Sequence, residues 1–201
     1  MGIDEAGRGP ILGPMVLAGV YATPAQVEAM REAGVKDSKR FTGKRARPRR
    51  AALAAEIRRL ASAVAVRTVP PARIDAESLG EIERDEALSI IREIRPAGTV
   101  LFDGAQIFGR LAARLAHGRA EDDADANHLI VSAASVVAKA ERDRLFLEIA
   151  ARYEPEYGPL AGWGYVNPAT ERFLAAYRAR TGEWPAEMRR KWRRAGAPEP
   201  A

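Results

Sequence analysis

The sequence predicts an α/β domain built on a mixed β-sheet with helices on both faces. A short apolar opening leads through a Gly/Pro bend into the β-branched stretch ILGPMVLAGVYA (11–22), which indicates two strands joined by a bend. SAVAVRTV (62–69) alternates apolar and polar residues as a half-buried strand does. TVLFDG (99–104) is a short strand-like segment between two helical stretches. Strands that alternate with helices along a chain are typical of an α/β fold.

Residues with helical spacing account for the other expected elements. In the first helix, Thr23 is the expected N-cap, Pro24 takes the first position and Gly34 ends the helix. We expect helices at 23–34, 48–61, 71–96 (one short and one longer), 106–118 and 126–153, with two more helical pieces from about residues 169 and 185. The stretch at 154–168 is an aromatic loop rich in Gly and Pro, and AGAPEPA at the end reads as a loose tail.

The composition excludes several classes of protein. The 201 residues include no cysteine, which rules out disulfides and thiolate metal sites and fits a reducing compartment. We see no signal peptide and no apolar run of the roughly 18 residues that a membrane helix needs, so we expect a soluble cytoplasmic protein with no membrane partner. The net charge of +5 allows a polyanionic partner, although the arginine-rich composition also fits a GC-rich genome.

Four carboxylates stand at the ends of expected core elements. Asp4 and Glu5 end the first strand, Asp103 ends the strand at 99–103, and Asp125 directly precedes the longest helix. With no cysteine and only two histidines, such a set suits Mg²⁺ or Mn²⁺ rather than zinc. Neighbouring strand residues point to opposite faces, so Asp4 and Glu5 share a site only if the strand twists or bulges as it enters Gly7.

Simpler explanations exist for the same residues. Acidic residues number 27, so some fall at element ends by chance. Asp103 followed by glycine is also a turn signal, and Asp125 could be only a helix cap.

The longest expected helix carries a polar stripe. Ser135, Lys139 and either Arg142 or Asp143 recur at helical spacing among small apolar residues. A lysine in this setting either extends to reach an anion or forms an ion pair with Asp143, and the two interpretations are compatible.

Basic residues cluster at 44–50 and 189–194. A solvated helix face is the usual explanation for such runs. Four aromatic residues near the C-terminus would alternatively suit stacking on a nucleic-acid strand: Tyr157, Trp163, Tyr165 and Trp192.

Taken together, the motifs resemble those of the type 2 ribonucleases H, the ribonuclease HII family. The similarity begins with GIDEAGRGPILGP at the N-terminus. It continues in order through VKDSKRF, LFDG, DANHLIVSAASVVAKAERDR and GWGYVNPATERFL, over most of residues 1–177. The Gly-x-Gly-Tyr form of the aromatic loop and the Arg-x-x-Trp ending in EMRRKWRR resemble the archaeal and eukaryotic branch.

The resemblance implies a ribonuclease H-like fold with a C-terminal helical extension. It implies an endonuclease that hydrolyses the RNA strand of RNA–DNA hybrids, and that cuts 5′ of single ribonucleotides embedded in DNA to leave 5′-phosphate and 3′-hydroxyl ends. Such an activity would belong to DNA replication and ribonucleotide excision repair. The implied organisation is a catalytic domain at 1–153, a substrate-binding extension at 154–195 and a tail at 196–201, and a core of this size suits a monomer.

Site roles follow from the resemblance by motif. Two divalent ions, Mg²⁺ or Mn²⁺, would be held by four catalytic acids: Asp4, Glu5, Asp103 and Asp125. Gly7, Arg8 and Gly9 would test for the ribose 2′-hydroxyl, largely through the main chain. Lys39, Ser135 and Lys139 would hold phosphates, and Tyr165 would stack against the sugar at the junction.

Two other kinds of function remain open from the residues alone. A structure-selective DNA nuclease, such as a Holliday-junction resolvase or an integrase-like enzyme, also uses clustered acids but has no need of Gly7-Arg8-Gly9. A basic nucleic-acid-binding module would bind without cleaving, and its acids would be caps and turns.

Overall fold

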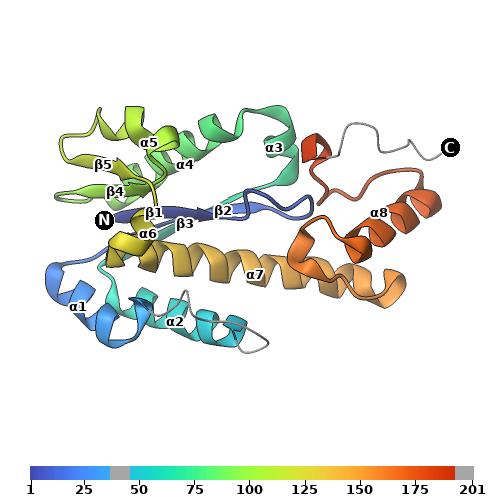
Figure 1. The fold of residues 1–201 in the computed structure, drawn as a ribbon, viewed down its shortest axis with the longest axis horizontal. Helices are drawn as coiled ribbons and strands as arrows, with labels where there is room; N and C mark the ends of the chain where they lie inside the picture. The colour runs from blue at the N-terminus through green and yellow to red at the C-terminus, as the bar shows by residue number, and fades with distance from the viewer. Residues whose placement is uncertain (37–45, 193–201) are drawn as a thin grey trace. The chain divides into compact units, whose positions relative to one another are not determined.

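The computed structural model describes residues 1–36 and 46–192 (Figure 1). The strands are β1 Gly2–Ala6, β2 Met15–Tyr21, β3 Ala63–Val69, β4 Val100–Asp103 and β5 Gly118–Glu121. The α-helices are α1 Pro24–Glu32, α2 Ala46–Leu60, α3 Pro71–Ala76, α4 Leu79–Ile94, α5 Ala105–Ala112, α6 Ala124–Asn127, α7 Leu129–Tyr157 and α8 Pro168–Thr181. The 3₁₀ turns η2 Gly162–Gly164 and η3 Arg190–Trp192 lie in the C-terminal part of the described residues.

The chain forms two compact units that interleave along the sequence. The first unit comprises Met1–Ala6, Val16–Arg67 and Leu79–Glu141. The second comprises Gly7–Met15, Thr68–Ser78 and Arg142–Ala201. The domains that we expected, with boundaries at residues 153 and 195, are continuous along the chain and do not interleave. That division stays a prediction.

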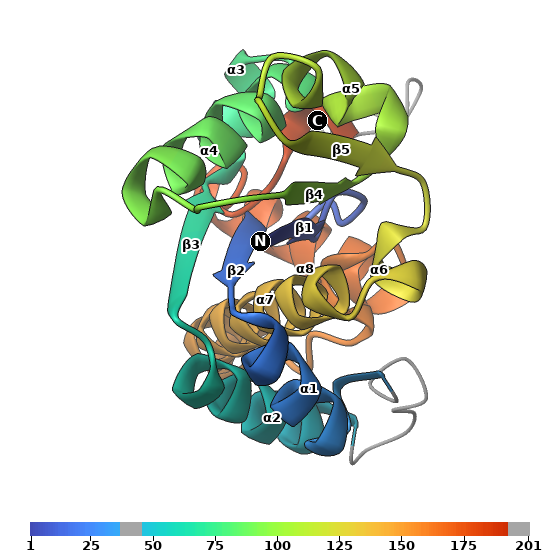
Figure 2. The ribbon, with the colours of Figure 1, turned by 90° about the vertical axis from the view of Figure 1, so that its left-hand side faces the viewer.

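The first unit is built on the mixed sheet that the sequence predicts. The strand order is β3-β2-β1-β4-β5, in which β1 runs antiparallel to β2 and parallel to β4, and β4 runs parallel to β5. Figures 1 and 2 show α4 and α5 on one face of this sheet, and α1, α2 and the start of α7 on the other. The expected α/β fold with helices on both faces is therefore confirmed.

Two glycines let helices approach the sheet closely. A Cβ on Gly2 would lie 2.4 Å from the carbonyl oxygen of Ile130 in α7, and a Cβ on Gly19 would lie 2.4 Å from the Cγ2 atom of Ile90 in α4. Since Gly19 pairs with Ile3, the neighbour of Gly2, these two contacts lie on opposite faces of the sheet. Asp4 consequently shares the face of β1 that α7 covers.

The local start signals of the first helix are confirmed. The Thr23 side chain accepts a hydrogen bond from the main-chain N–H of Gln26, and the Gln26 side chain accepts one from the N–H of Thr23. This reciprocal capping satisfies two donors that the helix itself leaves without partners.

Two boundary predictions are wrong near the acidic residues. The helix expected at 106–118 ends at Ala112, and Gly118–Glu121 pairs with β4 as the edge strand β5. The long helix begins at Leu129 rather than at residue 126, because His128 has an extended backbone and separates it from the one-turn helix α6.

The second unit has its own apolar core. Buried members from both ends of the chain meet there: Ile11, Leu12, Phe146, Ile149, Ala150, Leu160, Phe173, Leu174 and Met188. The helical piece expected from about residue 185 is reduced to the 3₁₀ turn Arg190–Trp192. Gly13 donates its main-chain N–H to Glu187, and Arg189 donates its own to Ile11, so the segment pairs with residues 11–13 instead. These hydrogen bonds to a distant part of the chain outweigh local helical propensity.

Candidate active site

Three aspartates of the first unit form one cluster. A carboxylate oxygen from each of Asp4, Asp103 and Asp125 lies within 4.8 Å of the others. β1 and β4 are adjacent parallel strands in which Ile3 pairs with Phe102, so the next residues, Asp4 and Asp103, lie side by side. Asp103 ends β4, whereas Asp4 lies in the middle of β1, which continues to Ala6 instead of ending at Asp4 and Glu5 as expected. Three of the four predicted acids are therefore brought together by the sheet and by α6.

Asp125 is positioned by hydrogen bonds to its neighbour in the cluster. One carboxylate oxygen of Asp103 accepts the main-chain N–H of Ala124 at 2.7 Å, and the Asp103 carboxylate also accepts the N–H of Asp125. These donors belong to the first turn of α6. Asp123, not Asp125, occupies the N-cap position, so Asp125 is not merely a cap.

Asp122 makes a similar hydrogen bond between the end of β5 and the start of α5. One oxygen of Asp122, which follows β5, accepts the main-chain N–H of Ala105 at the start of α5 at 2.8 Å. Asp122 therefore holds the start of the helix that follows β4, while Asp103, at the end of β4, holds the start of the helix that follows β5.

Burial and crowding determine the electrostatics of the cluster. Burial, with a smaller contribution from the nearby Asp103 charge, raises the pKa of Asp4 to about 6, against a hydrogen bond from Ser135 and the charge of Lys139. Burial is also the main cause that raises the pKa of Asp103, with Asp125 contributing. Lys139 donates a hydrogen bond from Nζ to the Ser135 hydroxyl at 2.8 Å. The polar stripe predicted on the long helix thus connects to the acidic cluster through Ser135.

Glu5 lies outside the group formed by the three aspartates. The pairing of β1 with β2 runs without interruption from Gly2 to Ala6, so the bulge that would bring Glu5 to the face of Asp4 is absent from this pairing. Its role as a fourth metal ligand stays a prediction.

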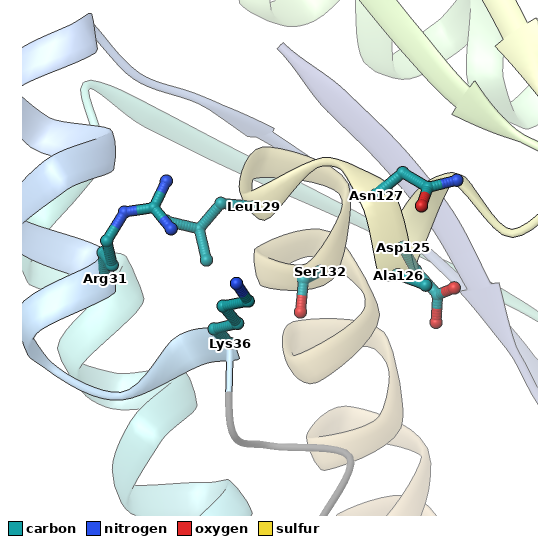
Figure 3. Close-up of a pocket in the computed structure, with 7 residues that line it drawn as sticks. All are labelled: Arg31, Lys36, Asp125, Ala126, Asn127, Leu129 and Ser132. Atoms are coloured by element: carbon teal, nitrogen blue, oxygen red, sulfur yellow. The ribbon is translucent and has the colours of Figure 1, made fainter.

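A pocket of about 200 Å³ lies beside Asp125 (Figure 3). In Figure 3, Arg31 and Lys36 lie on one side of it, and Asp125, Asn127 and Ser132 lie on the other. The predicted phosphate ligand Lys39 falls outside the described residues, as does the start of the basic cluster at 44–50.

The predicted sugar-reading residues lie in the second unit. Gly7 has a φ of +87°, a conformation that favours glycine, and Arg8 and Gly9 are exposed. A Cβ on Gly9 would lie 3.2 Å from the Cε1 atom of Tyr165, a residue that is 53% exposed. The structure thus places Gly9 and Tyr165 in contact on an accessible surface.

Comparison with known proteins shows the family of this chain. The model of the ribonuclease HII family matches residues 1–195. The chain belongs to the ribonuclease HII family. Ribonuclease HII of Haloarcula marismortui is 42% identical over 95% of this chain and 90% of the relative, and that of Thermococcus onnurineus is 37% identical over 96% and 86%.

Solved structures of ribonuclease HII agree with the fold. The ribonuclease H2 of Pyrococcus horikoshii is similar with a TM-score of 0.82 at 32% identity, over 95% of this chain and 92% of that one. The ribonuclease HII in a structure of its complex with PCNA, from Archaeoglobus fulgidus, has a TM-score of 0.78 at 33% identity, over 95% and 92%. The resemblance to the archaeal branch is confirmed.

Family membership makes the chain a hydrolase of the ribonuclease H class. It agrees with endonucleolytic cleavage of RNA in RNA–DNA hybrids, and it disfavours both the DNA-nuclease and the binding-module alternatives. Within the described residues, no helix has both the length and the apolar character needed to span a bilayer.

Three of the four aromatic residues suggested for stacking on nucleic acid are partly buried in the protein, and their stacking role stays a prediction. Tyr157, Trp163 and Trp192 pack against the apolar core of the second unit. Their rings cover buried side chains, as in the contact of Trp163 with Phe146 at 5.2 Å between ring centroids. Only Tyr165 remains largely exposed.

Sequence reasoning missed a buried arginine in this ribonuclease HII. Arg189 lies in a run of charged residues that suggests a solvated face, yet its side chain is fully buried. It donates hydrogen bonds to the carbonyl oxygens of Gly7, Arg8 and Gly13. The one available signal was the Arg-x-x-Trp ending, which begins at this residue.

Proposed function

We propose that this ribonuclease HII hydrolyses the RNA strand of RNA–DNA hybrids and also cuts on the 5′ side of single ribonucleotides in duplex DNA. The products would carry 5′-phosphate and 3′-hydroxyl ends. The observation that carries the proposal is the convergence of Asp4, Asp103 and Asp125 within 4.8 Å, in a chain of this family.

The acidic cluster fits divalent cations. Its donors are all carboxylate oxygens, which suit Mg²⁺ and Mn²⁺. The pKa of about 6 at Asp4 reflects a buried carboxylate beside a second one, and a bound cation would offset this cost. We propose that two ions are held by Asp4, Asp103 and Asp125, with Glu5 as a further ligand. When bound, such ions supply an activated water and stabilise the leaving 3′-oxygen.

Other side chains of the first unit would orient the substrate. Lys139 carries a positive charge near the cluster and is hydrogen-bonded to Ser135, so the pair is suited to holding a phosphate near the acids. Lys39 is proposed for the same role from its motif. Arg31 and Lys36 line the pocket beside Asp125 and would hold a further phosphate of the backbone.

Recognition of ribose would depend on the second unit. We propose that the main chain of Gly7, Arg8 and Gly9 contacts the 2′-hydroxyl, which is the group that distinguishes RNA from DNA. Tyr165, in contact with Gly9, would stack against the sugar at the junction. Because glycine has no side chain, position 9 leaves room for both the 2′-hydroxyl and the Tyr165 ring.

The test is cleavage of a labelled DNA duplex that contains one ribonucleotide, with Mg²⁺ or Mn²⁺. An all-DNA duplex and the Asp4→Asn variant are the controls. The expected result is cutting on the 5′ side of the ribonucleotide by the wild-type protein, with no cutting in either control. Binding without cleavage by the folded protein in either metal would contradict the proposal.

We further propose that the enzyme acts as a monomer in the cytoplasm during DNA replication and ribonucleotide repair. Light scattering of the protein at assay concentrations tests the monomer: the mass expected for one chain is 21.9 kDa.

A further inference from the structure

All three guanidinium nitrogen atoms of Arg189 donate hydrogen bonds to the main chain of residues 7–13. Its Nη2 donates to the carbonyl oxygen of Gly7 at 2.6 Å, Nη1 to that of Arg8 at 2.9 Å and Nε to that of Gly13 at 2.9 Å. These are the carbonyls of the Gly7–Gly9 segment and of the turn that follows it. A planar guanidinium has the fixed fork of donors that this arrangement needs, whereas a lysine ammonium is a single point.

The surroundings hold Arg189 in this orientation. Its side chain is fully buried and its guanidinium lies 5.4 Å from the centre of the Trp192 ring. Its own main-chain N–H donates to Ile11 at 2.8 Å. Burial and the charge of Arg142 lower the pKa of Arg189 to about 10, so the group stays cationic at neutral pH.

These hydrogen bonds fix the direction of two amide groups. The carbonyls of Gly7 and Arg8 belong to the peptide units whose N–H groups come from Arg8 and Gly9. In a trans peptide the N–H points away from the C=O, and both of these peptides are trans. With the two carbonyls held on the guanidinium, the N–H groups of Arg8 and Gly9 point away from it, and both residues are exposed.

We propose that Arg189 is a positioning residue for ribose recognition, which holds the Arg8 and Gly9 amides in the orientation that meets a 2′-hydroxyl oxygen. The inference rests on the proposed reading of the ribose by residues 7–9. It gives Arg189 a role different from phosphate binding, which its place in a basic cluster would suggest. A deoxyribose offers no acceptor at this position, so the amides would discriminate by hydrogen bonding.

The experiment compares the affinities of two duplexes that differ only in one ribonucleotide, with Ca²⁺ in place of Mg²⁺ so that binding is measured without cleavage. Wild-type protein is expected to prefer the ribonucleotide duplex by about 10-fold, the value of one or two well-made hydrogen bonds. Arg189→Gln should reduce this preference to about twofold or less, mainly by weaker binding of the ribonucleotide duplex.

Arg190→Gln is the matched control, because Arg190 is the adjacent, exposed arginine of the same cluster. Loss of its charge should change the affinities for both duplexes by the same factor and leave their ratio intact. If Arg189→Gln behaves like Arg190→Gln while wild-type protein discriminates, the positioning role is overturned and the proposed function stands. If wild-type protein neither discriminates nor cleaves at a single ribonucleotide, both are overturned.

Circular dichroism establishes whether the variants fold. Should Arg189→Gln fail to fold, Arg189→Lys keeps the charge and the aliphatic stem. This variant is expected to lose at least about threefold of the preference, because a single ammonium nitrogen cannot occupy the three positions from which Nε, Nη1 and Nη2 donate. In the wild-type protein, NMR supplies a measurement that needs no variant. The Arg8 and Gly9 amide signals should shift with the ribonucleotide duplex and not with the all-DNA duplex, and equal shifts would overturn the inference.

Discussion

Asp103 accepts a hydrogen bond from the main-chain N–H of Ala124 at 2.7 Å, and through it one acid of the cluster holds the turn that carries another. The contact joins the end of β4 to the first residue of α6. Asp125 is the next residue, so the hydrogen bond fixes the spacing between Asp103 and Asp125.

Replacing Asp103 separates its structural role from its proposed metal-binding role. Asp103→Asn keeps an oxygen that can accept the Ala124 N–H but removes a charge that burial disfavours, so we expect no loss of stability and at least about a 100-fold loss of kcat. Asp122→Ala is the counterpart: it removes the cap on Ala105, should cost about 1 kcal/mol, and should leave kcat within about threefold. Urea unfolding and single-ribonucleotide cleavage are measured on both. An Asp122→Ala variant as inactive as Asp103→Asn would make Asp122 part of the catalytic site.

Asp4 should destabilise the metal-free protein at neutral pH. Its pKa is about 6 in the folded protein against an ordinary value of 3.8, so the folded state binds the proton more tightly. Stability of the metal-free protein therefore falls as the pH rises from about 4 to 6. Asp4→Asn removes this cost and should raise the free energy of unfolding at pH 7 by about 2–3 kcal/mol, with no gain from this source below about pH 4.

Urea unfolding in EDTA from pH 4 to pH 8 measures this effect. The same variant should be inactive in the cleavage assay, which would make Asp4 a residue kept for function at the expense of stability. A variant less stable than the wild-type protein at pH 7 would contradict the assigned environment of Asp4.

Gly9 and Tyr165 should be energetically coupled. A Cβ at position 9 would lie 3.2 Å from the Tyr165 ring, so Gly9→Ala should displace the ring and lower kcat/KM on the single-ribonucleotide duplex by about 10-fold. Once Tyr165→Ala has removed the ring, adding Gly9→Ala should cost less, with a coupling energy of about 0.5–1 kcal/mol. Strictly additive losses in this double-mutant cycle would show that the two residues act separately.

The pocket beside Asp125 makes a prediction about salt. If Arg31 and Lys36 each meet a phosphate, Arg31→Ala and Lys36→Ala should each raise KM and reduce the slope of log affinity against log salt by about one. Arg92→Ala, an exposed arginine on α4, is the charge-matched control and should leave the slope unchanged. Slopes equal to that of the control would remove the pocket from the substrate path.

The acidic cluster was predictable because strand ends are visible in the sequence. Asp4 and Asp103 each follow a short apolar segment, and the pairing of β1 with β4 brings the two aspartates together, although β1 itself continues to Ala6. β5 was not visible, since GRAE has no apolar alternation and becomes a strand only by hydrogen bonding to β4. The break at His128 was hidden for a different reason, because the residues on both sides of it have helical spacing.

Burial of Arg189 could not be read from its neighbours. Arg189 and Arg190 are adjacent and chemically identical, yet one is fully buried and the other exposed. The difference arises from carbonyl groups more than 170 positions away in the chain. Local patterns of charge contain no information about such contacts.

The dependence of α6 on Asp103 also constrains how this sequence can drift over generations. A four-residue helix has little stability of its own, so Asp125 holds its place largely because a neighbouring acid accepts the amides of its turn. Most substitutions at Asp103 would disturb two acids in a single step. We therefore expect selection to act on the two aspartates together, since loss of Asp103 would leave little reason to keep Asp125.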